Sequence, residues 1–214
     1  MSLNECSTNF REIEFVVVDN ASTDRTVEVL WALIPNLQFN VRLVHELRKG
    51  VSHARNTGAK VAQADIFVFI DSDIRFTQKF VDHLWSVTGQ PDFGGATIRT
   101  LAEPGSLKGT LVFYLIELIK MVFPKAFGKS VATRDGFETI GGFDPGVKLG
   151  ENVIFVSGLK HYAKKTQQKF YHISSPIYCS LRRFEKLGYS KILFPWFFAY
   201  MGERHLPYET VDEL

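Results

Sequence analysis

Residues 66–73 read Ile-Phe-Val-Phe-Ile-Asp-Ser-Asp, and this stretch decides the fold. Its first five residues are all β-branched or aromatic, which is typical of a strand buried on both faces in a parallel sheet. Ligands bind at the carboxyl ends of such strands. Because the run ends directly in Asp71 and Asp73, we expect both carboxylates to lie at a binding site.

Two aspartates separated by one small residue suit a particular chemistry. Hard divalent cations take oxygen ligands and often share them with substrate phosphates, so Asp71 and Asp73 can meet a metal ion and a ribose hydroxyl together. A nucleotide-diphosphate donor offers this combination of groups. The simpler explanation is that both residues only cap the helix expected to begin near Thr77, and for an isolated pair it is the more common one. The choice therefore depends on the rest of the chain.

On both sides of this strand, apolar runs alternate with helical patterns, as in an α/β domain with a mostly parallel central sheet. The predicted strands cover residues 14–18, 41–45, 66–70, 92–99 and 169–178. The predicted helices cover residues 26–34, 50–64, 77–87, 106–123 and 151–163, with more helix from residue 180. The helix at 106–123 is apolar on most faces, so we expect it to pack in the core.

Composition limits the class of protein. The chain has 214 residues, of which 45% are hydrophobic, and can bury a full core as one domain. Its 25 Lys and Arg against 23 Asp and Glu argue against nucleic-acid binding, which needs a clustered basic face. Cys6 and Cys179 lack metal-ligand spacing and predict neither a disulfide framework nor a zinc site. A reducing cytoplasm fits this cysteine usage best, and we find no signal peptide and no apolar run of membrane-spanning length.

The aromatic run at residues 192–201 has two explanations. With Lys191 and Arg204 at its ends, it suits a segment that lies at a membrane interface, which would make the protein peripheral at the inner face of the cell membrane. A terminal helix packed on the core or on a second subunit explains the run equally well. Both explanations stay open at this point.

Five blocks along the chain carry a resemblance through their order and spacing. They read VVVDNASTDRT (16–26), KGVSHARNTG (49–58), IDSD (70–73), FETIGGFD (137–144) and GEN (150–152). In these blocks the chain resembles the family 2 glycosyltransferases, which have the Rossmann-like GT-A fold. The resemblance implies a nucleotide-sugar-binding half at about 12–100, an acceptor half at about 101–183 and a C-terminal helical and aromatic segment at about 184–214.

The resemblance also implies a reaction. It is the inverting, metal-dependent transfer of a sugar from a nucleotide-sugar, most often a UDP-sugar, to a saccharide or lipid-linked acceptor of the cell envelope. Asp19, Asn20 and Ser22 would contact the nucleotide, and the Asp19 carboxylate would accept a hydrogen bond from an N–H group of the base. Asp71 would lie near the ribose and the metal, and Asp73 would be a metal ligand. Without the resemblance, Asp19 could equally cap the turn that follows it.

Three arginines are candidates for binding the negative charge of the donor. Arg55 can bring a planar cation to the nucleotide or its diphosphate, although a surface salt bridge explains it as well. Arg182 and Arg183 can meet the diphosphate or an anionic lipid phosphate, and a solvated basic patch is the simpler explanation. A bound Mg²⁺ or Mn²⁺ would neutralise the departing nucleoside diphosphate.

Residues 151 and 152 depart from the family pattern, which is Glu-Asp with the Asp taken as the general base. Asn152 cannot usefully accept a proton, so Glu151 is the expected base. Favourable charge at a helix N-terminus explains Glu151 equally well. Asp144 and His161 are weaker candidates, because we expect Asp144 to cap the glycine-rich turn and His161 to lie on a solvated helix face.

A second departure lies upstream of Glu14, where family members usually carry a strand and a helix and this chain has about a dozen mostly polar residues. An uncovered sheet edge invites pairing with another chain, so a homodimer through this edge is a hypothesis. Both departures favour an alternative function, that of a catalytically weak or inactive relative that binds nucleotide or sugar as an assembly module. A nucleotidyltransferase is a third hypothesis, but the phosphate loop it needs is not visible.

Overall fold

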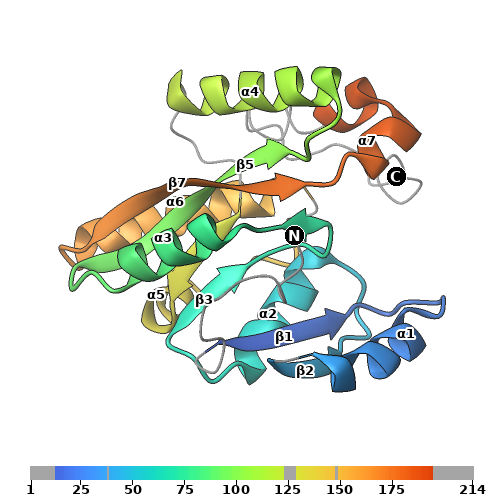
Figure 1. Ribbon diagram of the computed structural model, residues 1–214. Coiled ribbons are helices and arrows are strands. Elements are labelled where there is room, and N and C mark those ends of the chain that lie inside the picture. The colour runs from blue at the N-terminus through green and yellow to red at the C-terminus, as the bar shows by residue number, and fades with distance from the viewer. Residues whose placement is uncertain (1–12, 38, 123–128, 148, 195–214) are drawn as a thin grey trace.

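The computed structural model describes residues 13–37, 39–122, 129–147 and 149–194, which fold into an α/β structure (Figure 1). In chain order its elements are β1 (Glu14–Asp19), α1 (Thr26–Leu33), the 3₁₀ helix η3 (Ile34–Asn36), β2 (Asn40–His45), α2 (Val51–Val61), β3 (Ile66–Phe69), β4 (Ile74–Arg75), α3 (Gln78–Thr88), β5 (Phe93–Ala102), α4 (Leu107–Val122), β6 (Ser130–Thr133), α5 (Arg134–Thr139), α6 (Glu151–Lys165), β7 (Lys169–Cys179) and α7 (Arg182–Leu187). Residues 189–194 are also helical.

The described strands form two sheets. β1 and β2 form a parallel pair, in register from Glu14 opposite Asn40 to Asp19 opposite His45. The others form a five-stranded sheet in the order β3-β6-β5-β7-β4, where β5 and β7 are parallel and the remaining pairs are antiparallel. The expected α/β class is confirmed. The pairing is mixed rather than mostly parallel, because the short strands β4 and β6, which the sequence pattern missed, run antiparallel to their neighbours.

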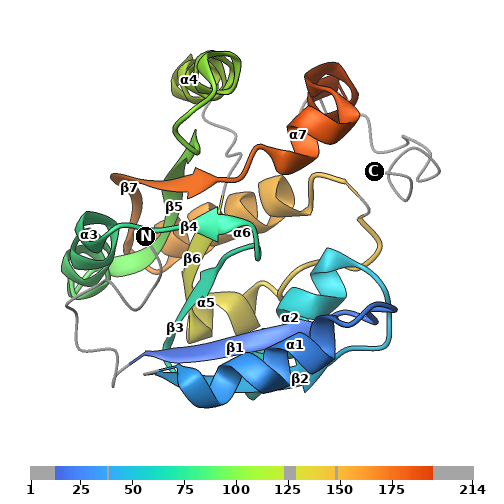
Figure 2. The ribbon, with the colours of Figure 1, turned by 45° about the vertical axis from the view of Figure 1, so that its right-hand side comes forward.

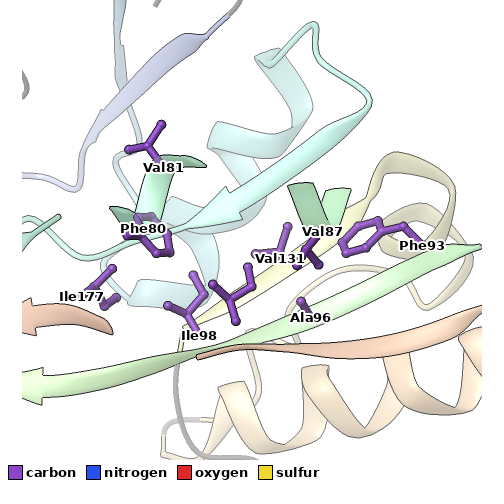
Figure 3. Packing of buried hydrophobic residues seen from close by; sticks show 9 residues of the cluster. Phe80, Val81, Val87, Phe93, Ala96, Ile98, Val131 and Ile177 are labelled. Atoms are coloured by element: carbon purple, nitrogen blue, oxygen red, sulfur yellow. The ribbon is translucent and has the colours of Figure 1, made fainter. Parts of the chain in front are cut away.

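Helices α3 and α6 cover opposite faces of the larger sheet (Figures 1 and 2). Successive side chains of a strand point to opposite faces. On β6, Val131 accordingly packs with Phe80 and Val87 of α3 (Figure 3), whereas Ala132 packs with Phe155 of α6. The sheet is thus buried on both faces, and its strand ends and loops are left to form a site.

Helix α4 packs outside these two layers. Its inner face joins a separate apolar cluster, whose buried members are Ala102, Phe113, Leu181, Phe184 and Ile192. The prediction that this helix packs in the core is wrong for its outer face, where Leu107 is 88% and Leu111 70% exposed. The reason is position, because α4 lies beyond the ends of β5 and β7, where the described chain places no further layer over it (Figure 1).

The long predicted elements are present, with ends shifted by a few residues. The structure adds β4, β6 and α5, which span two to six residues and are too short for a periodic pattern to reveal. None of the described helices has the length and apolar content needed to cross a membrane. Cys6, Arg204 and residues 195–201 of the aromatic run lie outside the described residues.

Candidate active site

The guanidinium of Arg55 connects residues from three parts of the chain. Its Nη2 donates to Asp71 Oδ1 at 2.9 Å, and its Nη1 donates to Glu151 Oε1 at 3.0 Å and to Asn152 Oδ1 at 3.1 Å. The Arg55 side chain is 9% exposed, and its Cζ lies 5.0 Å from the centre of the Phe143 ring. A surface salt bridge therefore does not describe it. Arg55 joins the end of β3 to the start of α6.

Local backbone geometry places these residues. Helix α2 begins after Gly50, whose φ of 131° favours glycine, and Gly58 lies close to Val18, so α2 packs tightly on β1. Helix α6 begins at Glu151, directly after Gly150 in the left-handed region at φ 83°. Glu151 therefore occupies the first turn of α6, where the positive end of the helix dipole favours a carboxylate.

Asp71 has a second cationic partner, Lys129, which donates to its Oδ2. Phe69 pairs with Ser130 in the antiparallel β3–β6 ladder, so Lys129 arrives next to the residues that follow β3. Burial acts to raise the pKa of the Asp71 carboxyl, but the charges of Lys129 and Arg55 outweigh it and lower that pKa. Sequence reasoning missed Lys129, because the strand β6 that follows it has only four residues, which is too short for a hydrophobic pattern to predict.

Asp73 differs from Asp71 in lacking a cationic partner within the described residues. Its Oδ1 is buried and accepts no hydrogen bond there, and its Oδ2 lies 3.8 Å from Cys179 Sγ. Burial, with the nearby Asp73 charge, raises the pKa of the Cys179 thiol to about 12, so the thiol stays protonated and donates. Neither aspartate caps α3, since Thr77 Oγ1 accepts the Phe80 N–H. A buried carboxylate oxygen without a partner is costly unless a ligand meets it.

These residues fit a divalent metal that is held jointly with a substrate. No group of three or more His, Cys, Asp or Glu side chains in the described part of the chain is arranged to bind a metal alone. Mg²⁺, however, is usually bound through one or two carboxylates and completed by substrate phosphates and water. The unpartnered oxygen of Asp73, with Asp71 two residues before it, matches that arrangement.

Asp19 ends β1 and is buried. Its Oδ1 accepts the Ser22 N–H at 3.4 Å, and its Oδ2 lies 3.3 Å from His45 Nδ1. Hydrogen bonds, first from the Ser22 side chain and then from His45, lower the pKa of Asp19 despite its burial. The anionic carboxylate thus holds the turn that follows, as the simpler explanation required, and its contact with a nucleotide base stays a prediction.

Asn20 ties the loop after β1 to the loop after β2. Its Nδ2 donates to the carbonyls of Glu46 and Arg48 at 3.1 and 2.7 Å, and its Oδ1 accepts the Gly50 N–H at 2.8 Å. These bonds engage both ends of the amide with backbone, so the geometry gives Asn20 a positioning role. Its predicted contact with a nucleotide stays a prediction.

Glu46 is a buried carboxylate that sequence reasoning did not single out. Arg48 donates to both of its oxygens at 3.0 and 2.8 Å, and Thr57 Oγ1 donates at 2.6 Å. These hydrogen bonds, those of the Arg48 side chain above all, lower the pKa of Glu46. The residue therefore joins β2 to α2 as an anion and supports the helix that carries Arg55.

The remaining predicted residues are placed as follows. Asp144 Oδ1 accepts the Gly146 N–H at 2.8 Å, so it caps the glycine-rich turn as expected. His161 is exposed on α6, also as expected. Arg182 and Arg183 are exposed at the start of α7, a short distance along the chain from Ser180, whose N–H donates to the Asp73 carbonyl at 3.0 Å. The chain segment that carries the two arginines is thus hydrogen-bonded to the backbone of Asp73. Among the described residues, neither arginine contacts Arg55 or the residues that Arg55 bonds.

The turn before α6 is held by Asn56, another residue that the sequence did not reveal. Asn56 Nδ2 donates to the Phe143 carbonyl at 2.7 Å, and Asn56 Oδ1 accepts the Phe143 N–H at 2.9 Å. Gly142 has φ 73°, and a Cβ there would stand 2.8 Å from both Asn56 Oδ1 and Phe137 Cζ. This turn thus fixes Phe143, on which Arg55 packs.

We expect Gly142→Ala to destabilise the protein by about 2–4 kcal/mol, because it adds a left-handed backbone penalty to a steric clash. Gly141→Ala is the matched control, since Gly141 has φ 78° but open space around its Cβ position, and it should cost only about 1 kcal/mol. Urea unfolding of the three proteins measures both values. Equal losses in the two variants would show that the packing of Asn56 and Phe137 leaves room for a methyl group.

Residues 2–138 match the model of the family described as Glycosyl transferase family 2. The chain belongs to this family. The glycosyltransferase GlyG of Streptococcus pneumoniae is 31% identical over 85 residues, which are 39% of this chain and 28% of GlyG. The uncharacterized glycosyltransferase YibD of Escherichia coli is 36% identical over 61 residues, 28% of this chain and 17% of YibD. The matched part is thus less than a third of the length of either relative.

Solved structures of glycosyltransferases share the fold. The mannosyltransferase PcManGT of Pyrobaculum calidifontis, in complex with GDP-Man and Mn²⁺, matches with a TM-score of 0.64 and 20% identity over 91% of this chain and 56% of that chain. Staphylococcus aureus TarS with UDP-GlcNAc matches with a TM-score of 0.60 and 16% identity over 79% and 50%. The resemblance to the family and the GT-A fold are therefore confirmed for this family 2 chain.

Proposed function

We propose that this family 2 chain transfers a sugar from a nucleotide-sugar to a hydroxyl group of a saccharide or lipid-linked acceptor, with inversion and with a divalent metal. The observation that carries the proposal is the bridge made by Arg55. One guanidinium holds Asp71, the carboxylate assigned to the donor, and Glu151, the carboxylate assigned to the acceptor. The donor carboxylate and the acceptor carboxylate are thus both hydrogen-bonded to Arg55, which holds the two halves of the proposed site together.

On the donor side, we assign the base to Asp19, the ribose to Asp71, and the metal to Asp73 with Asp71. A bound Mg²⁺ or Mn²⁺ would supply positive charge to the leaving diphosphate. Support for the metal comes from the buried, unpartnered Oδ1 of Asp73. The proposal of such a donor is supported by the ligands of two structural neighbours, Mn²⁺ with GDP-Man in PcManGT and UDP-GlcNAc in TarS. Arg55, Arg182 and Arg183 are candidates for binding the diphosphate.

On the acceptor side, we assign the general base to Glu151. Its Oε1 accepts hydrogen bonds from Arg55 and from Asn152 Nδ2, the latter at 3.1 Å, so Oε2 is the oxygen that takes the proton of the acceptor hydroxyl. Asn152 then orients the base instead of acting as one. Inversion follows if the acceptor oxygen attacks from the side of Glu151 and the diphosphate leaves from the side of Asp73.

A binding module without turnover is the alternative, and Asn152 favours it. The Asn152 amide stands where family members usually carry the base, and an amide cannot usefully accept the proton of the acceptor. Cytoplasmic location at the inner membrane face and a homodimer through β1 also stay proposals. β1 pairs with β2 alone among the described strands, which leaves its other edge for such a partner.

A thermal-shift titration with UDP-, GDP- and dTDP-sugars, with and without Mn²⁺, tests the donor site. A ligand that binds only the folded state stabilises it by about 2.7 kcal/mol at a hundredfold excess over Kd. For a domain of this size we expect the melting temperature to rise by about 5–10 °C with one donor, and only with metal. Equal shifts without metal would contradict the metal assignment, and no shift with any donor would contradict the proposed function. Binding without turnover on any acceptor would support the binding module instead.

A further inference from the structure

The outer face of α4 is apolar and uncovered by the described residues. It consists of six side chains, each of which lies three or four residues from another, so that they share one face of the helix. All six are between 37% and 88% exposed, and they are Leu107, Leu111, Tyr114, Leu115, Leu118 and Ile119. A continuous apolar stripe of this size on a protein surface usually marks an interaction site.

The packing of α4 fixes the direction of this face. Phe113 on the inner side is 5% exposed and packs edge-on against Phe184 of α7. A Cβ at Gly109 would overlap the Leu181 side chain, so the helix approaches α7 as closely as glycine permits. Because the inner face is firmly held, the outer face is turned away from the described part of the protein.

Positive charge gathers at the same end of the molecule. Residues 99–122 and 180–194, which carry α4, α7 and the adjoining segments, contain seven Lys and Arg but three Glu, a net charge of +4 in a chain whose total is +2. Arg182, Arg183, Lys186 and Lys191 are all exposed. Figures 1 and 2 both show α4 and α7 together at one end, opposite β1 and β2. The rest of the chain thus has a net charge of −2.

We infer that this end of the protein docks on an anionic lipid surface. The outer face of α4 would lie at the boundary between headgroups and acyl chains, and the cations of α7 would contact the anionic headgroups. An apolar helix face combined with basic residues is how interfacial helices bind membranes. The 16 residues of α4 extend about 24 Å, which is shorter than the hydrocarbon core, so the helix lies in the plane. The inference deepens the proposed membrane contact and does not depend on sugar transfer.

The arrangement connects this surface to the candidate active site. Cys179 and Ser180, which contact Asp73, lie three and two residues before Arg182, where α7 begins. A membrane against α4 and α7 would therefore lie close, along the chain, to Asp73 and the metal side of the site. A second copy of this chain suits the face less well, because a symmetric dimer presents the same patch twice and would bring two regions of charge +4 together.

Co-sedimentation of the chain with vesicles tests the inference. The probes are vesicles of phosphatidylcholine alone and of phosphatidylcholine mixed equally with phosphatidylglycerol. We expect binding to the mixed vesicles that weakens with salt, and a loss of about tenfold or more in L111E/L115E, because a buried carboxylate must give up its hydration. V29E/L33E on α1 is the matched control, since it places the same charges at the same spacing on exposed apolar residues at the other end of the molecule.

Each outcome bears on the docking surface. Binding by wild type and V29E/L33E with loss in L111E/L115E supports it, provided that circular dichroism shows all three proteins folded. Equal binding by L111E/L115E, equal binding to neutral vesicles, or no binding by the wild type overturns it. A dimeric mass in light scattering that L111E/L115E reduces to a monomer, without vesicle binding, assigns the face to a second copy. Retention of the donor-induced thermal shift in L111E/L115E separates failure of docking from failure of the proposed function.

Discussion

Asp73→Asn is expected to lose the metal-dependent thermal shift with the donor and to lower turnover by about a hundredfold or more. The asparagine has the same shape and keeps one oxygen, so the fold should stand. It lacks the negative charge that a divalent cation requires, and its amide nitrogen can occupy the position of the unpartnered oxygen. That oxygen, Oδ1, is buried and meets no donor within the described residues, and a cation is the partner that we propose for it.

The measurement is donor hydrolysis over a range of Mn²⁺ concentrations, beside the thermal shift. Asp82→Asn is the matched control, because Asp82 is exposed on α3 and accepts a hydrogen bond from the neighbouring Gln78, away from the Arg55 bridge. Asp82→Asn should behave as the wild type. A metal response that survives in Asp73→Asn would exclude Asp73 as a ligand and leave Asp71, with its partners Arg55 and Lys129, as the remaining carboxylate of the pair.

The end of β3 was predictable from sequence because local patterns determine it. An uninterrupted apolar run specifies a strand, and its length fixes the position of the residues that follow it. Asp71 and Asp73 could therefore be assigned to a site before their neighbours were known. The family blocks identified Arg55 and Glu151 in the same way, by order and spacing. The expected parallel pairing and burial on both faces were wrong, because β3 pairs antiparallel with β6 alone among the described strands and Ile66 and Val68 are only partly buried.

The contacts within the site were not predictable. Arg55 and Glu151 are 96 residues apart, and only the packing of α2 and α6 brings them together. Lys129 reaches Asp71 through the register of β6, a strand of four residues that no periodic pattern reveals. For helix α4, the element was predictable from sequence but the environment of its outer face was not. Its apolar composition was recognisable, but whether its outer face meets the core or the surroundings depends on where the chain leaves the sheet.

Glu151→Gln is expected to lower kcat by about 10²–10⁴-fold while leaving donor affinity nearly unchanged, as for the loss of a general base. The glutamine oxygen can still accept from Arg55 and Asn152, so the network at the start of α6 keeps its geometry. The substitution removes the negative charge that pairs with Arg55 and, in the proposed role, the capacity to take the acceptor proton. A purely structural role for Glu151, as a charge at the helix N-terminus, would lower stability and leave kcat intact.

Single-turnover transfer, measured beside the donor-induced thermal shift, separates these two roles. Glu138→Gln provides the control for the charge change, because Glu138 is 64% exposed and its nearest cation, Arg134, is 3.8 Å away. Full turnover in Glu151→Gln would show that another group accepts the proton. Because Asn152 cannot do so, that outcome, together with unchanged donor binding, would move the search for the base to the acceptor itself or to residues outside the Arg55 cluster.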